Sequence, residues 1–555
     1  MTDRASSPED SAQGGLLRSS SAMALGTSLS RITGVLRDTS AAIALGFFLV
    51  ADAFSLANSL PTIIYILIIG GSLNAVFVPQ LVRRMKEDSD GGWGYANRLL
   101  TITTVLLVIL TAAAVICAGW IIDLYTPDDF PPTDYNLAVA FARLCLPQIL
   151  FYGLYTMVSQ VLNARGVFGW PMFAPIANNV IGIATFLGFA FVASGAAADG
   201  DLTSSQVLFL GLGTTLGVVV QAVILIPVLF KAGFRLRPSL NWHGLGRTGT
   251  LAAWTVGLVL VNQVTNLVII RLAARANVEA TAAGVVNAGF TTYQRAHLIF
   301  LLPHSIITVS LVTALLPRLA RTAHDGDLPG VGADIGRAMR VVASIILPIA
   351  AVLAVCGTDL AVGLFGYGAA TIAQATVLGN VVTVFMIGLL PFTLFYVLLR
   401  GFYAIEDTRT PFVISAIFSL LWMALAIPLF ALASAGGQQI QSLALTYSLA
   451  YWVTCAVAWL WLRRRLRSLD DKRTLSSLLR LVLVTAVCLV AMTLIRQALT
   501  AALSESALAA QFSALLTLGV VSLVGGGLFV VLARSVRVGE VTEALALMSR
   551  RVLRR

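Results

Sequence analysis

Long apolar stretches follow one another along almost the whole chain, separated by short polar connections. Many of them exceed the roughly 18 residues that a helix needs to cross the hydrocarbon core of a bilayer. The pattern therefore predicts an all-α membrane protein with about fourteen transmembrane helices. The expected spans are 22–48, 52–82, 97–121, 136–163, 170–194, 205–230, 248–274, 281–317, 336–358, 370–402, 411–433, 440–462, 477–499 and 510–533.

Charges in the connections predict the topology. The connections after even-numbered spans are rich in arginine, above all "RRRLRSLDDKR" at 463–473, whereas those after odd-numbered spans are acidic or neutral, as in "DLYTPDDFPPTD" at 123–134. Cytoplasmic loops carry the excess of arginine and lysine, so both termini are expected in the cytoplasm. Residues 1–21 are polar and rich in serine and predict a disordered cytoplasmic tail, and 534–555 predict a basic one.

Short similarities suggest that the chain contains an internal duplication. Three of them occur in the same order with nearly the same offset, which chance does not easily produce. The pairs are Pro79 with Pro317 (317 − 79 = 238), Leu124 with Leu364 (364 − 124 = 240), and Pro171 with Pro411 (411 − 171 = 240).

The repeat predicts two six-helix halves at 22–230 and 248–465, followed by two additional helices at 477–533. Because six is an even number, both halves would insert with the same orientation, as parallel repeats about an axis along the membrane normal. Such halves enclose a central cavity and rock against each other in transporters. The predicted architecture is therefore that of a transporter.

Composition agrees with a membrane protein. Of 555 residues, 58% are hydrophobic and only 11% are charged, whereas a soluble chain carries roughly 25% charged residues. The net charge of +11 reflects topology better than nucleic-acid binding, so no nucleic-acid partner is expected. The five cysteines all lie in apolar stretches, without metal-ligand spacing, and are interpreted as small core residues.

Sequence signatures of enzymes are missing. The chain contains neither GxxxxGK nor HExxH, and its four histidines form no metal-ligand cluster in sequence. We therefore expect no catalytic residues, no metal and no cofactor, and the protein is not expected to be an enzyme. An ion gradient or the membrane potential is the expected driving force.

Three charges interrupt the first span, "SLSRITGVLRDTSAAIALGFF" at 28–48. A charge at the bilayer centre costs at least ~2.5–3.5 kcal/mol on insertion scales, so it usually faces protein or water. Arg31, Asp38 and Ser30 share one helical stripe, with Arg37 at its flank. Either Arg37 and Asp38 neutralise each other and merely pack, or these residues line a hydrated, cationic cavity that holds a polyanion.

Other charges are placed at similar depth. Asp52 precedes "AFSLANSLP", Arg143 lies in the fourth span and Arg295 in the eighth. For Arg143 and Arg295, packing and a position in the cavity are equally good interpretations. Several arginines with few acids favour an anionic substrate such as a phosphate or pyrophosphate.

The segments "SRITGVLRD", "ADAFSLANSLP", "GGSLNAVFVPQL", "VLNARGVFGWPMFAP" and "GFYAIEDTRTP" together resemble the MurJ/MviN family. These are the lipid II flippases of peptidoglycan synthesis, in the multidrug/oligosaccharidyl-lipid/polysaccharide exporter superfamily. The resemblance covers residues 22 to 535. It implies alternating access around an arginine-lined cavity that receives the pyrophosphate and sugars of an undecaprenyl-linked precursor, with two C-terminal helices forming a groove for the lipid tail.

Individual residues can be carried over from the family. Arg31, Arg37 and Asp38 match its first-helix charges, Asp52 its second-helix acid, and Arg143 a basic position in its fourth helix. The chain departs from the family at three positions. These are Tyr65, where relatives often have Arg, Gly70, where they often have an acid, and Leu298, where they have Arg while Arg295 stands three residues earlier.

The function expected from this resemblance is transfer of lipid II from the inner to the outer leaflet of the bacterial cytoplasmic membrane. The expected partners are the undecaprenyl-linked anionic lipid and membrane lipids, and cell-wall synthesis and division proteins are further candidates. Two alternatives stay open. One is an exporter of another lipid-linked glycan or of small drugs, and the other is a non-transporting scaffold of a cell-wall assembly complex.

Overall fold

The fold is helical throughout the part of the chain that the computed structural model describes, namely residues 8–67, 80–81, 83–193, 200, 202–239, 249–504 and 508–541. Contacts between residues divide the chain into two compact units. Unit 1 consists of Met1–Gly46 and Ala53–Gln263, and unit 2 consists of Phe47–Asp52 and Val264–Arg555. The short segment Phe47–Asp52 therefore packs with the second half of the chain although it lies early in the sequence.

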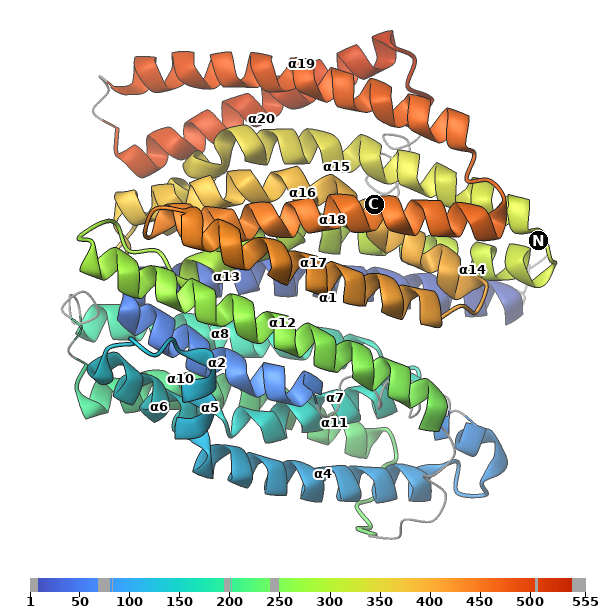
Figure 1. The fold of residues 1–555 in the computed structure, drawn as a ribbon. Helices are drawn as coiled ribbons and strands as arrows, with labels where there is room; N and C mark the ends of the chain where they lie inside the picture. Colours follow the sequence, from blue (N-terminus) through green and yellow to red (C-terminus); the bar gives the residue numbers. More distant parts are fainter. Residues whose placement is uncertain are drawn as a thin grey trace, which may run out of the picture. The chain divides into compact units, whose positions relative to one another are not determined.

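Unit 1 is built mainly from the helices of the first half (Figure 1). Helix α1 packs along α8, α4 packs against α7, and α10 contacts α6, α7 and α8. A buried apolar core that includes Leu99, Met157 and Leu225 joins α4, α7 and α11. The helices are α1 (Pro8–Leu45), α2 (Leu49–Tyr65), α4 (Trp93–Ile116), α5 (Ala118–Tyr125), α6 (Pro132–Cys145), α7 (Gln148–Ala164), α8 (Gly169–Val192), α10 (Ser204–Val223) and α11 (Leu225–Lys231).

Unit 2 contains the remaining helices. Helix α16 packs between α15 and α18, α17 packs on α18, and α19 and α20 lie together against α15 (Figure 1). These helices are α12 (Gly249–Ala282, divided between the units after Gln263), α13 (Phe290–Pro303), the π-helical turn η2 (His304–Thr308), α14 (Val309–His324), α15 (Leu328–Phe365), α16 (Ile372–Ala404), α17 (Arg409–Leu432), α18 (Gly437–Leu466), α19 (Asp471–Ser504) and α20 (Ala510–Ser535).

The helices confirm the predicted fold class. Twelve stretches in the described ranges are long and apolar enough to cross a membrane, and α2 is a shorter apolar helix. Together with the charge-bearing α1, they correspond to the fourteen predicted spans. The second span extends beyond α2 into residues outside the described ranges, which include Gly70 and Pro79.

Several predicted spans are not single straight helices. The fourth consists of α6 and α7, which separate at Leu146 and Pro147 because proline cannot donate the helical hydrogen bond. The eighth consists of α13, η2 and α14, and its π-helical turn directly follows Pro303. Helix α1 begins at Pro8, far earlier than the span predicted from residue 22.

Helix boundaries recur at the offset found in the sequence. Helices α8 (Gly169–Val192) and α17 (Arg409–Leu432) are 240 residues apart at both ends (409 − 169 and 432 − 192). The turns before them match too, because Gly166 and Glu406 both have positive φ, 78° and 58°. Pro171 and Pro411 are the third residues of these two helices, and both are buried. The predicted halves at 22–230 and 248–465 stay a prediction about how the repeats superpose.

Candidate functional site

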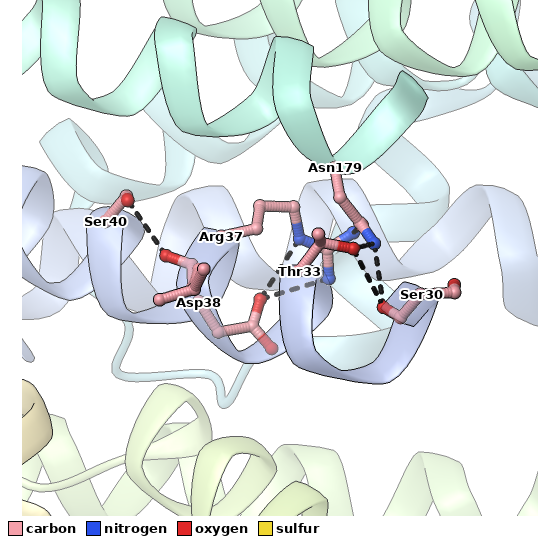
Figure 2. Close-up of polar contacts among 7 residues, drawn as sticks. Ser30, Thr33, Arg37, Asp38, Ser40 and Asn179 are labelled. Atoms are coloured by element: carbon pink, nitrogen blue, oxygen red, sulfur yellow. Dashed lines mark hydrogen bonds and ion pairs between the residues drawn. The ribbon is translucent and has the colours of Figure 1, made fainter. Parts of the chain in front are cut away.

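Arg37 of unit 1 is held from two sides (Figure 2). Its Nε and Nη2 donate to Asp38 Oδ1 at 3.2 and 3.0 Å, and its Nη1 donates to Asn179 Oδ1 of α8 at 3.3 Å. The exposed fractions of the Arg37 and Asp38 side chains are 35% and 21%. The ion pair that the sequence suggested therefore forms, and an amide from another helix fixes the guanidinium as well.

Asn179 ties this site to the backbone of α1. Its Nδ2 donates to the Ser30 carbonyl oxygen at 3.0 Å and to Thr33 Oγ1 at 2.9 Å (Figure 2). One side-chain amide thus fixes both the helix α1 and the arginine on it. Ser30 takes part in this contact through its backbone carbonyl group.

A glycine of α8 makes room for the arginine stem. A Cβ atom at Gly182 would lie 2.9 Å from Arg37 Cδ and 3.0 Å from Cγ, closer than carbon atoms ordinarily approach. The stem of Arg37 therefore packs directly on the backbone of α8. This contact explains why the charge is positioned by α8 as much as by its own helix.

Arg31 is in a different situation from Arg37. Its side chain is exposed, and it has no hydrogen bond or ion pair with the residues that the structure describes. Of the residues predicted on one stripe, Ser30 contacts Asn179 of α8 and Asp38 pairs with Arg37. Arg31 takes no part in these contacts. Arg143 in the last turn of α6 is likewise exposed and has no ion pair within the described ranges.

Asp52, in the first turn of α2, belongs to unit 2. Only 2% of its surface is exposed. Its Oδ2 accepts hydrogen bonds from the Phe290 amide at 3.0 Å and from Asn277 Nδ2 at 2.9 Å, and its Oδ1 accepts one from the Thr291 amide at 2.7 Å.

These contacts make Asp52 a cap for another helix. The amides of Phe290 and Thr291 open α13 and have no acceptor within that helix, and a carboxylate there also meets the positive end of the helix dipole. Gly289 permits this arrangement, because a Cβ atom at that position would collide with Asp52 Oδ2. The contacts favour a structural role for Asp52, and the prediction that it binds substrate stays untested.

Arg295 lies one turn further along α13 and is 6% exposed. Its guanidinium carbon is 4.8 Å from the centre of the Phe47 ring, within the range of a cation–π contact. Phe47 also accepts a hydrogen bond from Asn277 Nδ2 at its carbonyl oxygen, at 3.3 Å. Arg295 contacts Phe47 at one end of the segment Phe47–Asp52, and Asp52 at its other end caps the helix that carries Arg295. The structure therefore brings these two predicted residues to the same short segment.

A polar network in unit 1 was missed by the sequence analysis. Gln148 of α7 is 1% exposed, and its Nε2 donates to Asn58 Oδ1 at 3.3 Å and to Thr215 Oγ1 at 3.1 Å. Asn179 and the residues of this network are uncharged and lie in apolar helices. A search for charged residues therefore does not find them. The signal was available in "FAPIANNVIG" and "CLPQIL", because amides in a membrane helix need partners.

An aromatic cluster in unit 2 surrounds the two histidines of the eighth span. The His297 ring lies 5.3 Å from that of Tyr447 and 5.6 Å from that of Phe385, and the His304 ring lies 4.5 Å from that of Phe392. Both histidines therefore pack among aromatic side chains. Of the five cysteines, Cys117 is exposed, which corrects the expectation that all five are core residues.

A family model described as "Lipid II flippase MurJ" matches residues 41–512 of the chain. The chain belongs to the lipid II flippase MurJ family. The match includes the segment around Asp52, all of unit 2 up to the start of α20, and most of unit 1. Membership in this family, together with twelve long apolar helices, indicates a multi-pass protein of the bacterial inner membrane.

Curated MurJ relatives match most of the chain. A "Probable lipid II flippase MurJ" of Rhizobium meliloti (strain 1021) is 29% identical over 416 residues, which are 74% of this chain and 74% of the relative. A "Lipid II flippase MurJ" of Burkholderia cenocepacia is 28% identical over 397 residues, covering 69% and 72%. The MurJ resemblance inferred from the sequence motifs is thus confirmed.

Solved structures show the same fold. A structure described as "Lipid II flippase MurJ, inward closed conformation" superposes with a TM-score of 0.69 at 19% identity and covers 93% of this chain and 99% of its own. An inward-facing multidrug resistance MATE family transporter of the MOP superfamily gives a TM-score of 0.58 at 14% identity, covering 80% and 96%. These likenesses confirm the predicted fold.

Proposed function

We propose that this chain moves lipid II, the lipid-linked peptidoglycan precursor, from the inner to the outer leaflet of the bacterial cytoplasmic membrane by alternating access. The observation that carries the proposal is the match of the MurJ family model over 41–512, which spans nearly the whole helical part of the chain. The arginines of α1 support it, because a pyrophosphate in a membrane needs cationic partners.

Within this proposal, Arg31 and Arg37 contact the substrate differently. Arg31 is exposed and free of ion pairs within the described ranges, so its full charge is available to a phosphate oxygen. Arg37 is already oriented by Asp38 and Asn179, and its charge is partly compensated by the carboxylate. Ser30 and Asp38 then shape this surface, and Arg143 adds an exposed positive charge on α6.

Arg295 and Asp52 support transport indirectly in this proposal. Both residues fix the segment Phe47–Asp52 and the start of α13. These contacts would keep this part of unit 2 rigid while the protein changes conformation. The membrane potential or an ion gradient supplies the energy, since 100 mV is worth about 2.3 kcal/mol for each elementary charge moved. The protein then transports without catalysing a chemical reaction, and both termini are cytoplasmic.

The alternatives make different predictions. An exporter of cationic drugs would place acids where its substrate binds, whereas α1 presents Arg31 without a partner in the described ranges. The similarity to MATE transporters is a similarity of fold at 14% identity and says nothing about substrate. A scaffold that holds cell-wall synthesis and division proteins together would tolerate loss of the α1 charges.

A flippase-depletion strain tests the proposal. Expression of this chain is expected to restore growth and to make labelled lipid II accessible at the outer surface of the cells. The accessibility assay reports transfer itself, whereas growth alone would also be restored by a scaffold. Growth without restored lipid II accessibility, at a normal membrane level of the protein, would contradict the proposal.

A further inference from the structure

Four helices of unit 2 line an open cavity of about 440 Å³ at one end of the bundle. The C-terminal ends of α15 and α19 meet the N-terminal ends of α16 and α20 there, and Gln511 Nε2 joins two of these ends by donating to the Gly366 carbonyl oxygen at 2.6 Å. The polar part of the lining includes Thr358, Asp359, Arg496 and Thr500. The roles proposed above for Arg31, Arg37 and Asp52 do not involve these residues.

The lining residues that the structure describes contribute one charge of each sign. Arg496 Nε donates to Asp359 Oδ2 at 2.5 Å, and Arg496 Nη2 donates to Thr358 Oγ1 at 2.6 Å. The exposed fractions of the two side chains are 32% for Arg496 and 8% for Asp359. These contacts use Nε and Nη2, and Nη1 of the guanidinium has no partner among the residues that the structure describes. The charges of the described lining residues balance.

Several hydroxyl groups in the lining donate to backbone carbonyl oxygens. Thr500 Oγ1 donates to the Arg496 carbonyl oxygen at 2.9 Å, Thr517 Oγ1 donates to that of Ser513 at 2.9 Å, and Ser504 Oγ donates to that of Ala501 at 2.7 Å. A hydroxyl that has given its proton to the backbone keeps oxygen lone pairs. The cavity therefore offers several oxygens to a ligand that carries N–H or O–H groups.

The start of α20 adds a site for negative charge. Ala510, the first residue of α20, lines the cavity, and the first amides of a helix have no acceptor within it. These amides and the helix dipole favour an anion, and Arg496 contributes a positive charge to the same cavity. A phosphate group fits this pair of features.

Apolar residues form another part of the lining. They include Val362, Leu503, Leu508 and Ala514. Along α19 and α20, large apolar side chains such as Leu494 and Leu523 are exposed, by 61% and 79%. A ligand with a polar head and apolar tails could therefore place its head in the cavity and its tails along α19 and α20.

We propose that this cavity binds the headgroup of a zwitterionic phospholipid that carries a primary ammonium, with its phosphate at Arg496 and the start of α20. The ammonium lies against Asp359 and the hydroxyl oxygens. A headgroup of net charge zero matches the balanced pair of Arg496 and Asp359, and its N–H groups match the unused acceptors.

Native mass spectrometry of the purified full chain in detergent tests the proposal with three synthetic lipids that have identical acyl chains. Phosphatidylethanolamine has the ammonium donors, phosphatidylcholine has the same charge without N–H groups, and phosphatidylglycerol is anionic. We expect phosphatidylethanolamine to be retained at lower lipid concentration than either of the others. Equal retention of all three, preference for phosphatidylglycerol, or retention of none would overturn the proposal.

Variants locate the binding. The double variant Asp359→Asn with Arg496→Gln removes both charges at once and avoids leaving a buried carboxylate unpaired. It should weaken phosphatidylethanolamine binding about tenfold or more, as expected for losing charge-assisted hydrogen bonds. Thr500→Trp fills the cavity from an exposed position and should have the same effect while both charges remain.

The matched control is Arg480→Ala, which removes an exposed arginine from the same helix α19. It should bind phosphatidylethanolamine like the unmodified chain. Unchanged binding in both cavity variants would overturn the proposal, as would an equal loss in Arg480→Ala. Elution as a single folded species is checked for every variant, and Thr500→Trp keeps the test decisive should the double variant fail to fold.

Discussion

Asp52 Oδ1 accepts a hydrogen bond of 2.7 Å from the backbone amide of Thr291, although 239 positions separate the two residues in the sequence. With the contacts to Phe290 and Asn277, this bond makes an acid from the start of α2 the cap of α13. In the sequence, Asp52 stands out as a charge in an apolar span. In the structure, it accepts hydrogen bonds from backbone amides. The positive helix start that it faces favours a carboxylate at this position.

Asp52→Ala is expected to destabilise the protein by about 1–3 kcal/mol, because it removes a cap and leaves buried amides without an acceptor. Asp52→Asn retains one acceptor oxygen and should cost less. Thermal unfolding of the purified protein measures both effects. Asp129→Ala, at an exposed carboxylate, is the control and should leave the unfolding temperature unchanged. An equally stable Asp52→Ala protein would show that the cap contributes nothing.

Gly182→Ala is expected to displace Arg37, because the added Cβ would lie 2.9 Å from Arg37 Cδ. Overpacking of this kind typically costs about 1–3 kcal/mol. Lipid II transfer should fall while the membrane level stays near normal. Gly169→Ala on the same helix is the control, since a Cβ there has nothing within 4 Å. Equal transfer by the two variants would mean that the packing of Arg37 on α8 is unimportant.

Arg340 of α15 is buried, with 4% of its side chain exposed, and it contacts two carboxylates. Its Nη1 donates to Asp470 Oδ2 and Thr474 Oγ1, both at 2.9 Å, and its Nε lies 2.9 Å from Glu540 Oε1. Arg340 thereby connects α15 to the start of α19 and to the segment after α20.

Arg340→Met should destabilise the protein by about 3–5 kcal/mol, because the carboxylates lose their buried partner. Denaturation of the purified protein measures the loss. Arg337→Ala, at an exposed arginine on the same helix, should cost far less. A similar stability for the two variants would show that the buried cluster is replaceable by apolar packing.

The sequence predicts the helices of this fold well because crossing a bilayer imposes a length and an apolar composition on each of them. Within the described ranges the predicted spans coincide with helices, the second one only over α2, and the internal offset of 240 reappears at both ends of α8 and α17. The breaks inside spans were harder to predict. Pro147 interrupts the fourth span, whereas Pro175 and Pro391 lie within continuous helices, so neighbouring contacts decide what a proline does.

The candidate site was predicted only in part, because the sequence shows which residues are charged and not which helix packs beside them. Helical spacing placed Arg31 and Asp38 on one stripe, but the neighbouring α8 divides the group by supplying Asn179 to Arg37. Likewise, no spacing within one helix could pair Asp52 with the start of α13. Contacts between helices far apart in sequence carry this information.

Asp407 lies in the turn between α16 and α17, outside the membrane-spanning helices. Burial opposes its ionisation, but hydrogen bonds from the Thr410 amide and hydroxyl at 3.0 and 2.7 Å and the charge of Arg465 outweigh burial and lower the pKa of this carboxyl below its ordinary value. The ionised form therefore stabilises the fold at pH values above the pKa of the unfolded chain, and this contribution is lost as the pH falls through the lower folded-state pKa.

Asp407→Asn should accordingly lower the unfolding temperature at pH 7, and the difference from the unmodified chain should shrink as the pH is lowered towards 3. Thermal unfolding across this pH range measures it. Glu406→Gln, at the exposed acid next to it, is the control and should not change the pH dependence. A constant difference between Asp407→Asn and the unmodified chain at every pH would show that ionisation of Asp407 plays no part.

Arg31 and Arg37 are expected to respond differently to removal, and this difference tests their roles in transport. Arg31→Ala should leave the unfolding temperature unchanged, because Arg31 has no hydrogen bond or ion pair in the described part of the chain, yet it should abolish lipid II transfer. Arg37→Ala should lower both stability and transfer, since it breaks the contacts with Asp38 and Asn179. The loss of one charge-assisted contact is worth about 1.5–3 kcal/mol, roughly tenfold or more in an equilibrium constant.

Conservative replacement separates charge from geometry at these two positions. Arg31→Lys keeps the charge and should retain partial transfer, because a pyrophosphate accepts a point charge, whereas Arg37→Lys loses the planar fork that reaches both Asp38 and Asn179. Outer-surface accessibility of labelled lipid II in the depletion strain measures each variant, with membrane levels compared. Full transfer by a normally expressed Arg31→Ala protein would contradict a substrate contact at Arg31 and would favour the scaffold, because only a transporter of an anionic lipid needs that exposed charge.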